Sequence, residues 1–155
     1  MRTAKYSDDL NTIKNRYKYT ITQQSYVVDN QLNYSYFLGV LKNVDLDRKF
    51  KDLQQKMENK NINEIQKSEN KKILESLKEQ FNDIKIKAKA NYDYSNQLLL
   101  EIEKDYYKNK TKKDVVEIYD KVCRGIIDSA VEQYIKLEKS IIIIFENYKS
   151  LALSK

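Results

Sequence analysis

Apolar residues recur at steps of three and four along much of this chain, the spacing that places side chains on one face of an α-helix. The most regular run lies between residues 64 and 107 and consists of Leu74, Leu77, Phe81, Ile84, Ala88, Asn91, Ser95, Leu98 and Ile102. This pattern predicts a long helix with a coiled-coil-like seam. Two of its members, Asn91 and Ser95, are polar, and we expect them to set register or partner choice rather than to form a site.

Less regular patterns predict three more helices, over residues 5–41, 45–58 and 112–151 approximately. Asp45 is the expected N-cap of the helix that follows it. The asparagine-rich stretch 58–63 is the expected break before the long helix, although one continuous helix stays an alternative. The predicted fold is all-α: a single domain over residues 1–155, folded as an elongated antiparallel bundle of three or four helices with coiled-coil-like seams.

The last predicted helix carries two apolar stripes instead of one. The first runs from Val115 to Leu151, and the second consists of Val116, Cys123, Ile127, Val131, Ile135 and Ile142. Two stripes require two sets of neighbours, which come either from this chain or from another one. We expect the second stripe to meet a partner, and the predicted interface residues are Val131, Ile135, Ile142, Ile143 and Phe145.

Composition supports the helical interpretation. The chain has no proline and only two glycines, the residues that turns and sheets normally need. One of them, Gly125, lies in the middle of the last predicted helix, where glycine costs about 1 kcal/mol relative to alanine. We therefore expect Gly125 to let another helix approach closely. The single cysteine, Cys123, lies on the second apolar stripe, which predicts a small buried residue without a disulfide.

The residue types exclude most catalytic chemistry. The chain has no histidine, which removes Ser-His-Asp and Cys-His schemes and histidine-bearing metal sites. No glycine-rich loop is present to hold a phosphate. Acidic pairs such as Glu101 and Asp105 lie among lysines, as on a solvated helix face. We therefore expect no enzyme activity, no metal site and no cofactor.

The net charge of +6 is spread over the whole chain rather than gathered in one segment. Six acid-to-lysine pairs at a spacing of four residues are expected to form on exposed helix faces. They are Asp45–Lys49, Asp47–Lys51, Asp52–Lys56, Asp83–Lys87, Glu117–Lys121 and Glu132–Lys136. The local exception is the stretch KDYYKNKTKK, a predicted turn whose Lys108, Lys110, Lys112 and Lys113 are the expected contacts if the chain binds phosphate or nucleic-acid backbone.

No apolar run is long enough for a membrane span, and no signal-peptide pattern opens the chain. A cytoplasmic location is expected, with a virion or secreted location as the alternatives. The abundance of Lys, Asn, Ile and Tyr, whose codons are AT-rich, indicates an AT-rich genome, such as that of a low-GC bacterium, a protozoan, a virus or a plasmid.

Two short motifs are similar to those of small secreted helical-hairpin proteins that have a Trp-x-Gly turn and a later Tyr-x-x-x-acid export signal. They are Phe37–Leu38–Gly39 and the stretch from Tyr134 to Glu138. The resemblance covers eight residues, has Phe in place of Trp, and assigns no family. It implies a secreted substrate of a specialised export system, which is the third function that the sequence leaves open.

The leading expectation is a non-enzymatic interaction protein: a structural or adaptor bundle that binds another protein and self-associates through its C-terminal helix. The second expectation is an accessory protein that grips nucleic-acid backbone through the Lys/Tyr turn. Such binding would weaken steeply with salt.

Overall fold

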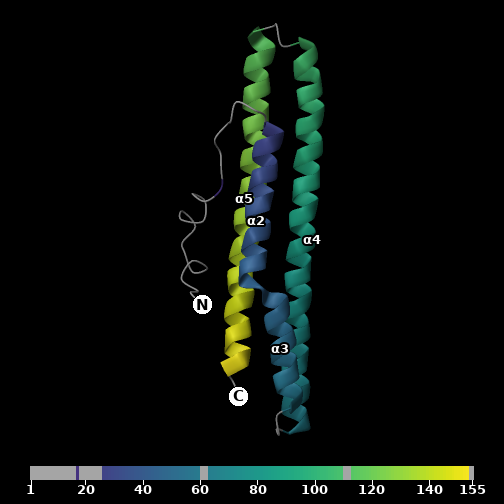
Figure 1. Cartoon of the computed structure of the whole chain (residues 1–155), viewed down its shortest axis with the longest axis vertical. Coiled ribbons are helices and arrows are strands. Elements are labelled where there is room, and N and C mark those ends of the chain that lie inside the picture. Colours follow the sequence, from purple (N-terminus) through teal and green to yellow (C-terminus); the bar gives the residue numbers. More distant parts are fainter. Residues whose placement is uncertain (1–16, 18–25, 60–62, 110–112, 154–155) are drawn as a thin grey trace.

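The structure is a computed structural model, and it describes Tyr17 and residues 26–59, 63–109 and 113–153. Its elements are α2 (Tyr26–Val44), α3 (Leu46–Asn59), α4 (Glu64–Asn109) and α5 (Lys113–Leu153). The described parts contain no strand. Figure 1 shows an elongated molecule in which the helices run nearly parallel to one long axis. The all-α bundle predicted from the sequence is confirmed.

The two longest helices, α4 and α5, form an antiparallel hairpin. They have 46 and 41 residues, which corresponds to roughly 70 and 60 Å at 1.5 Å per residue. The hairpin extends beyond the start of α2 at the end that carries the α4–α5 turn (Figure 1). The first part of the α4 seam is buried as predicted, at Leu74, Leu77, Phe81, Ile84 and Ala88.

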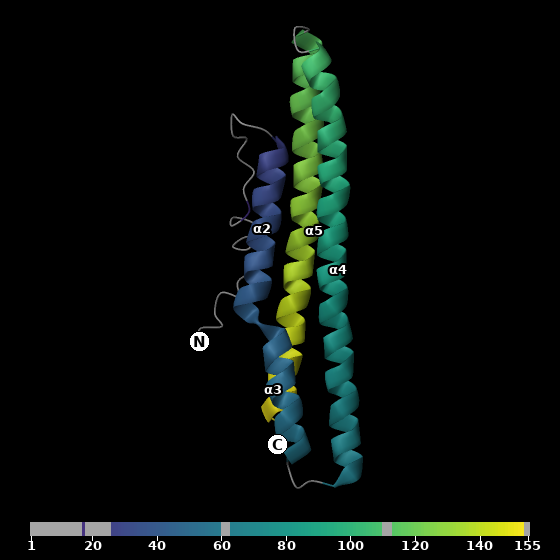
Figure 2. The ribbon, with the colours of Figure 1, turned by 45° about the vertical axis from the view of Figure 1, so that its right-hand side comes forward.

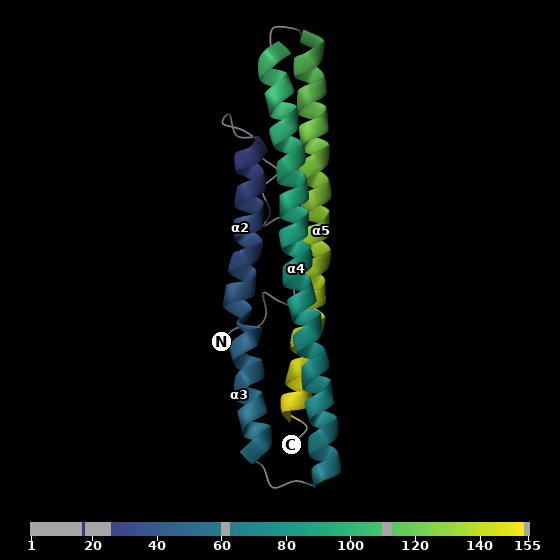
Figure 3. The ribbon, with the colours of Figure 1, turned by 90° about the vertical axis from the view of Figure 1, so that its right-hand side faces the viewer.

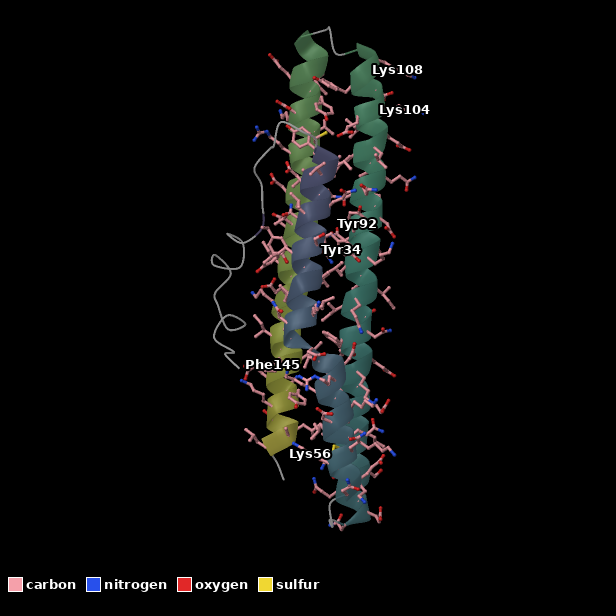
Figure 4. The ribbon with its side chains drawn as sticks, viewed as in Figure 1. Tyr34, Lys56, Tyr92, Lys104, Lys108 and Phe145 are labelled. Atoms are coloured by element: carbon pink, nitrogen blue, oxygen red, sulfur yellow. The ribbon has the colours of Figure 1, made fainter. Side chains whose placement is uncertain are left out.

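The seam changes after Ser95, where the sequence pattern is wrong by one residue. Leu99 is fully buried, whereas the predicted seam residue Leu98 is only half-buried. Near this change α4 has α2 as a second neighbour beside α5. Tyr92 stacks on Tyr34 of α2 with ring centroids 4.6 Å apart, and Figure 4 places these two side chains between the helices.

The third rod of the bundle consists of α2 followed by α3. Both lie on one side of the α4–α5 hairpin, as the turned views of Figures 2 and 3 show. The helix predicted over residues 5–41 differs from α2 at both ends. Tyr17 lies outside any helix, α2 continues to Val44, and the remaining predicted residues before Tyr26 fall outside the described ranges.

Asp45 joins α2 to α3 and has a left-handed backbone, with φ of 51°. Its backbone N–H donates to Leu41 O at 3.0 Å, and its carbonyl accepts from Lys49 N at 3.3 Å. Its carboxylate accepts from Arg48 Nε at 2.7 Å. The bonds from Arg48 hold the pKa of the Asp45 carboxyl below its usual range. Asp45 therefore ends one helix and begins the next, so the chain bends there instead of continuing as one helix.

The asparagine-rich stretch separates two helices. α3 ends at Asn59 and α4 begins at Glu64, running in the opposite direction (Figure 3). Asn63 caps α4, because its Oδ1 accepts from Gln66 N at 2.7 Å. The expected N-cap of α5, Thr111, lies outside the described residues.

Most of the second apolar stripe of α5 is buried within the chain itself. Cys123, Ile127, Val131 and Ile135 are at most 5% exposed. Aromatic side chains from α2 and Tyr17 gather next to this stripe, around Tyr134 in the middle of α5. The ring of Tyr134 stacks on Phe37 at 5.4 Å and on Tyr17 at 5.9 Å. Val116, at the start of the stripe, has no described side chain.

Candidate interaction surface

Three of the five predicted interface residues are buried in the core of the chain. Val131, Ile135 and Phe145 are at most 5% exposed, Ile142 is half-buried against the core, and only Ile143 stands out, with 59% of its surface exposed. Lys49 of α3 and Lys149 of α5 lie over the ring of Phe145, at 6.0 and 5.1 Å from its centroid. The expectation that this stripe is free for another chain is therefore corrected for these buried positions.

The basic turn is only partly described. Lys108 is exposed on the outer side of α4 together with Lys104 (Figure 4), whereas Lys110 and Lys112, and the side chain of Lys113, lie outside the described residues. The surrounding sequence balances these charges, because residues 101–121 contain six lysines and six acidic residues. A polyanion binds where positive charge is in excess. The local charge therefore does not favour the nucleic-acid alternative.

The described side chains form no group of three potential metal ligands. Within the same residues, no helix is long and apolar enough to cross a membrane. Cys123 is fully buried, and burial raises the pKa of its thiol to about 12. A thiol with so high a pKa is almost entirely protonated near neutral pH, so Cys123 is an inert core residue.

A groove of about 300 Å³ runs between α4 and α5. Its walls consist of Asn91, Tyr94, Ser95 and Leu98 from α4, and of Val122, Gly125, Ile126, Ser129 and Ala130 from α5. Two apolar members of the wall are strongly exposed, Tyr94 at 68% and Val122 at 41%. We call this feature the α4–α5 groove. The α5 residues that line it are not those whose rings pack on α2, and no described helix covers it.

The polar groups at the base of the α4–α5 groove already have partners. Asn91 Nδ2 donates to Ala130 O at 3.0 Å, which ties α4 to α5. Asn30 of α2 donates through Nδ2 to Ser95 Oγ at 3.0 Å, which ties α2 to α4. These bonds between helices agree with the register role expected of Asn91 and Ser95. Because the polar atoms are engaged, the groove offers mainly apolar and small side chains to a ligand.

Gly125 does not have the role that the sequence indicates. A β-carbon built at this position meets nothing within 4 Å, so no other part of the described chain approaches it closely. Gly125 is instead exposed at the wall of the α4–α5 groove, next to Ser129 one turn away. The space above it is open to another molecule.

A second depression, of about 520 Å³, lies nearer the other end of the hairpin. It is lined by Gln66, Asn70, Ile73, Ser76, Leu77, Gln80, Asn147, Ser150 and Leu151. Its α4 residues follow the same three-and-four spacing that continues to Asn91, Tyr94 and Leu98. Both depressions therefore lie along one side of the hairpin.

Of the six expected ion pairs, only Asp83–Lys87 forms, at 2.9 Å. Asp45 and Asp52 pair instead with Arg48, and Asp47 pairs with Lys85 of α4 at 2.7 Å. The two pairs expected on α5 do not form either. No ion pair joins Glu117, Lys121, Glu132 or Lys136 to any described residue, and all four are exposed.

The resemblance to Trp-x-Gly secreted proteins is not supported by the positions of its residues. Phe37, Leu38 and Gly39 lie inside α2 rather than in a turn, and Phe37 is fully buried. Tyr134 and Glu138 are also buried, and Glu138 Oε1 accepts a hydrogen bond from the Tyr17 hydroxyl at 3.1 Å. The aromatic residue of each motif and the acid of the second therefore belong to the core.

No family model, no curated protein and no solved structure matches this chain.

The sequence patterns missed the α4–α5 groove because they assigned Val122 and Ile126 to a buried stripe. The available signal was Gly125 followed by Ser129 four residues later, since small residues at that spacing leave a shallow place on a helix. They also missed buried Glu138, which lies seven residues after Val131 on the second apolar stripe. That spacing predicts burial, but an acidic residue is normally expected at the surface.

Proposed function

We propose that this protein acts by binding another protein, as a non-enzymatic structural or adaptor bundle, and that the α4–α5 groove is its binding surface. The observation that carries the proposal is the exposed apolar wall of this groove, with Tyr94 and Val122 on opposite sides of it. Exposed tyrosines and aliphatic side chains around a concave surface are typical of protein interfaces.

The chemistry of the groove fits a helix or another apolar protein segment better than a small polar ligand. Asn91 and Ser95 already have hydrogen-bond partners, so few polar groups remain to orient a small molecule. A helix needs a narrow apolar channel with room for its backbone, and Gly125 and Ser129 leave such room.

Site-specific photo-crosslinking tests this function in cells that make the protein naturally. A photoreactive amino acid replaces Ser129 in the groove, and the matched control carries it at Lys51, an exposed position on α3. We expect protein adducts at Ser129 and none at Lys51. The absence of any protein adduct at Ser129, or equal labelling at the two positions, would contradict the proposal.

A further inference from the structure

We propose that the α4–α5 groove is a self-interface that takes α5 of a second copy of this chain, in antiparallel orientation, with Gly125 near the twofold axis. This inference rests on the proposed function and names its partner. It also moves the expected self-association from the buried stripe of α5 to the opposite, exposed face of the same helix.

The first argument is the order of the exposed charges on α5. Going along the helix, Glu117, Lys121, Glu132 and Lys136 alternate in sign. Glu117 and Lys136 are equally distant from the point between Ile126 and Ile127, and so are Lys121 and Glu132. An antiparallel copy centred on that point brings Lys121 opposite Glu132 of the second copy and Glu117 opposite Lys136 of the second copy. Each charge then meets its opposite.

The same charges disfavour a parallel pair in register, because every residue would face its own like charge. They also have no ion pair with a described residue of their own chain, even though each has an opposite charge four residues away. Charge complementarity therefore selects the second copy and its direction.

The second argument is the shape of α5 at that midpoint. Gly125 and Ser129 are small and exposed, and nothing lies within 4 Å of a β-carbon built at Gly125. Small residues let two helix backbones approach closely at a crossing point. Exposed Ile118 and Val122 lie along the same face towards the hairpin tip, and Tyr94 of α4 stands at its edge. A second α5 would cover these apolar side chains.

Charge exchange tests the predicted register. Light scattering behind gel filtration measures the dimer constant of the wild type, Lys121→Glu, Glu132→Lys and the double variant. Each single variant turns two attractive contacts per dimer into repulsive ones, so we expect association to weaken by about tenfold. The double variant restores opposite charges, and we expect it to return to the wild-type constant. Circular dichroism checks that all variants keep their helix content.

Disulfide trapping tests the direction. Lys121→Cys combined with Glu132→Cys should give a covalent dimer under mild oxidation, because the two positions face each other in the antiparallel pair. Lys121→Cys alone should not, because it faces its own equivalent only in a parallel pair. The native Cys123 adds little background, since it is fully buried. A covalent dimer from the single variant would overturn the antiparallel arrangement.

Gly125→Leu tests the contact at the axis. The fold of one chain accepts this change, because the site is open, whereas a bulky side chain at the crossing point should abolish the dimer. A wild-type protein that stays monomeric at high concentration, or a Gly125→Leu dimer of unchanged strength, would overturn the inference. If such a monomer still gives adducts of a different protein at Ser129 in cells, the proposed function stands and only the self-interface is wrong.

Discussion

The two long sides of the α4–α5 hairpin differ in how their side chains are used. On the side that faces α2 and α3, aromatic rings stack and polar side chains are paired between helices, as in the contacts of Tyr134 with Phe37 and of Ser95 with Asn30. On the open side, Tyr94 and Val122 remain exposed, and four exposed charges of α5 form no ion pair with a described residue: Glu117, Lys121, Glu132 and Lys136. Both sides carry apolar residues at helical spacing, so spacing alone does not separate core from surface.

The largest expected effect contrasts two neighbouring leucines on α4. Leu99 is fully buried, and Leu100 is 51% exposed. Leu99→Ala should lower the free energy of unfolding by about 3 kcal/mol, because it removes buried methyl groups and leaves a cavity. Leu100→Ala should change it by less than about 0.5 kcal/mol. Urea unfolding followed by circular dichroism measures both. An equal loss of stability in the two variants would contradict the burial of Leu99 and the exposure of Leu100.

The tyrosine cluster on the covered side should make stability fall in alkali. Burial raises the pKa of Tyr17 and Tyr134 well above the ordinary value of about 10. The unfolded chain therefore releases these phenol protons at a lower pH than the folded chain does. Stability is unaffected by them below about pH 9 and declines as the pH rises through about 10.

Urea unfolding at several pH values from about 8 to about 11 measures this decline. Tyr134→Phe should make it shallower, because one titrating group is removed. Tyr94→Phe, at the exposed edge of the open side, is the matched control and should leave the slope as it is in the wild type. A flat profile for the wild type would contradict the role of the buried cluster.

A smaller effect is expected at the bend that lets α2 and α3 follow the covered side. Asp45→Ala removes the carboxylate that accepts from Arg48 and places alanine at φ of 51°. We expect the melting temperature to fall by roughly 3–6 °C. Asp45→Gly also loses the carboxylate but accepts the left-handed backbone without strain, so it should cost less. An alanine variant as stable as the glycine variant would show that the backbone angle is unimportant.

The smallest effect compares the two glycines. Neither Gly39 in α2 nor Gly125 in α5 has an atom within 4 Å of a built β-carbon. Each substitution by alanine should therefore stabilise one chain, by about 0.5–1 kcal/mol, through higher helix propensity. Thermal unfolding at low concentration measures this. Loss of stability at Gly125 alone would mean that a close neighbour is present there after all.

The sequence predicted the positions of the helices better than it predicted which side chains meet between them. The helical class, the turn near Asp45 and the separation of α3 from α4 at an asparagine-rich stretch follow from capping residues and from the absence of proline, which are local properties. The expected ion pairs failed at Asp47, whose partner lies on another helix, and at Asp52, whose partner Arg48 lies four residues before it instead of four residues after it. A pattern in one helix holds no information about the charge that the fold brings beside it.

Tyr17, near the start of the chain, is a second place where apolar spacing gave a wrong prediction. Tyr17 fits the apolar spacing of a long first helix, but its side chain lies in the core against Tyr134 and Glu138 while its backbone is not helical. A buried aromatic residue can be held by packing in any backbone conformation, so its spacing from other apolar residues did not predict its secondary structure.

By itself, the sequence determined that α5 is a long helix with more apolar surface than one neighbour can cover. Backbone hydrogen bonding in a helix is local, so spacing and composition were sufficient for that conclusion. Only the tertiary structure decided which surface is covered. It placed α2 and α3 on one side of the hairpin, buried Val131 and Ile135, and left Gly125 open. That choice depends on how helices distant in sequence fit together, which no single helix encodes.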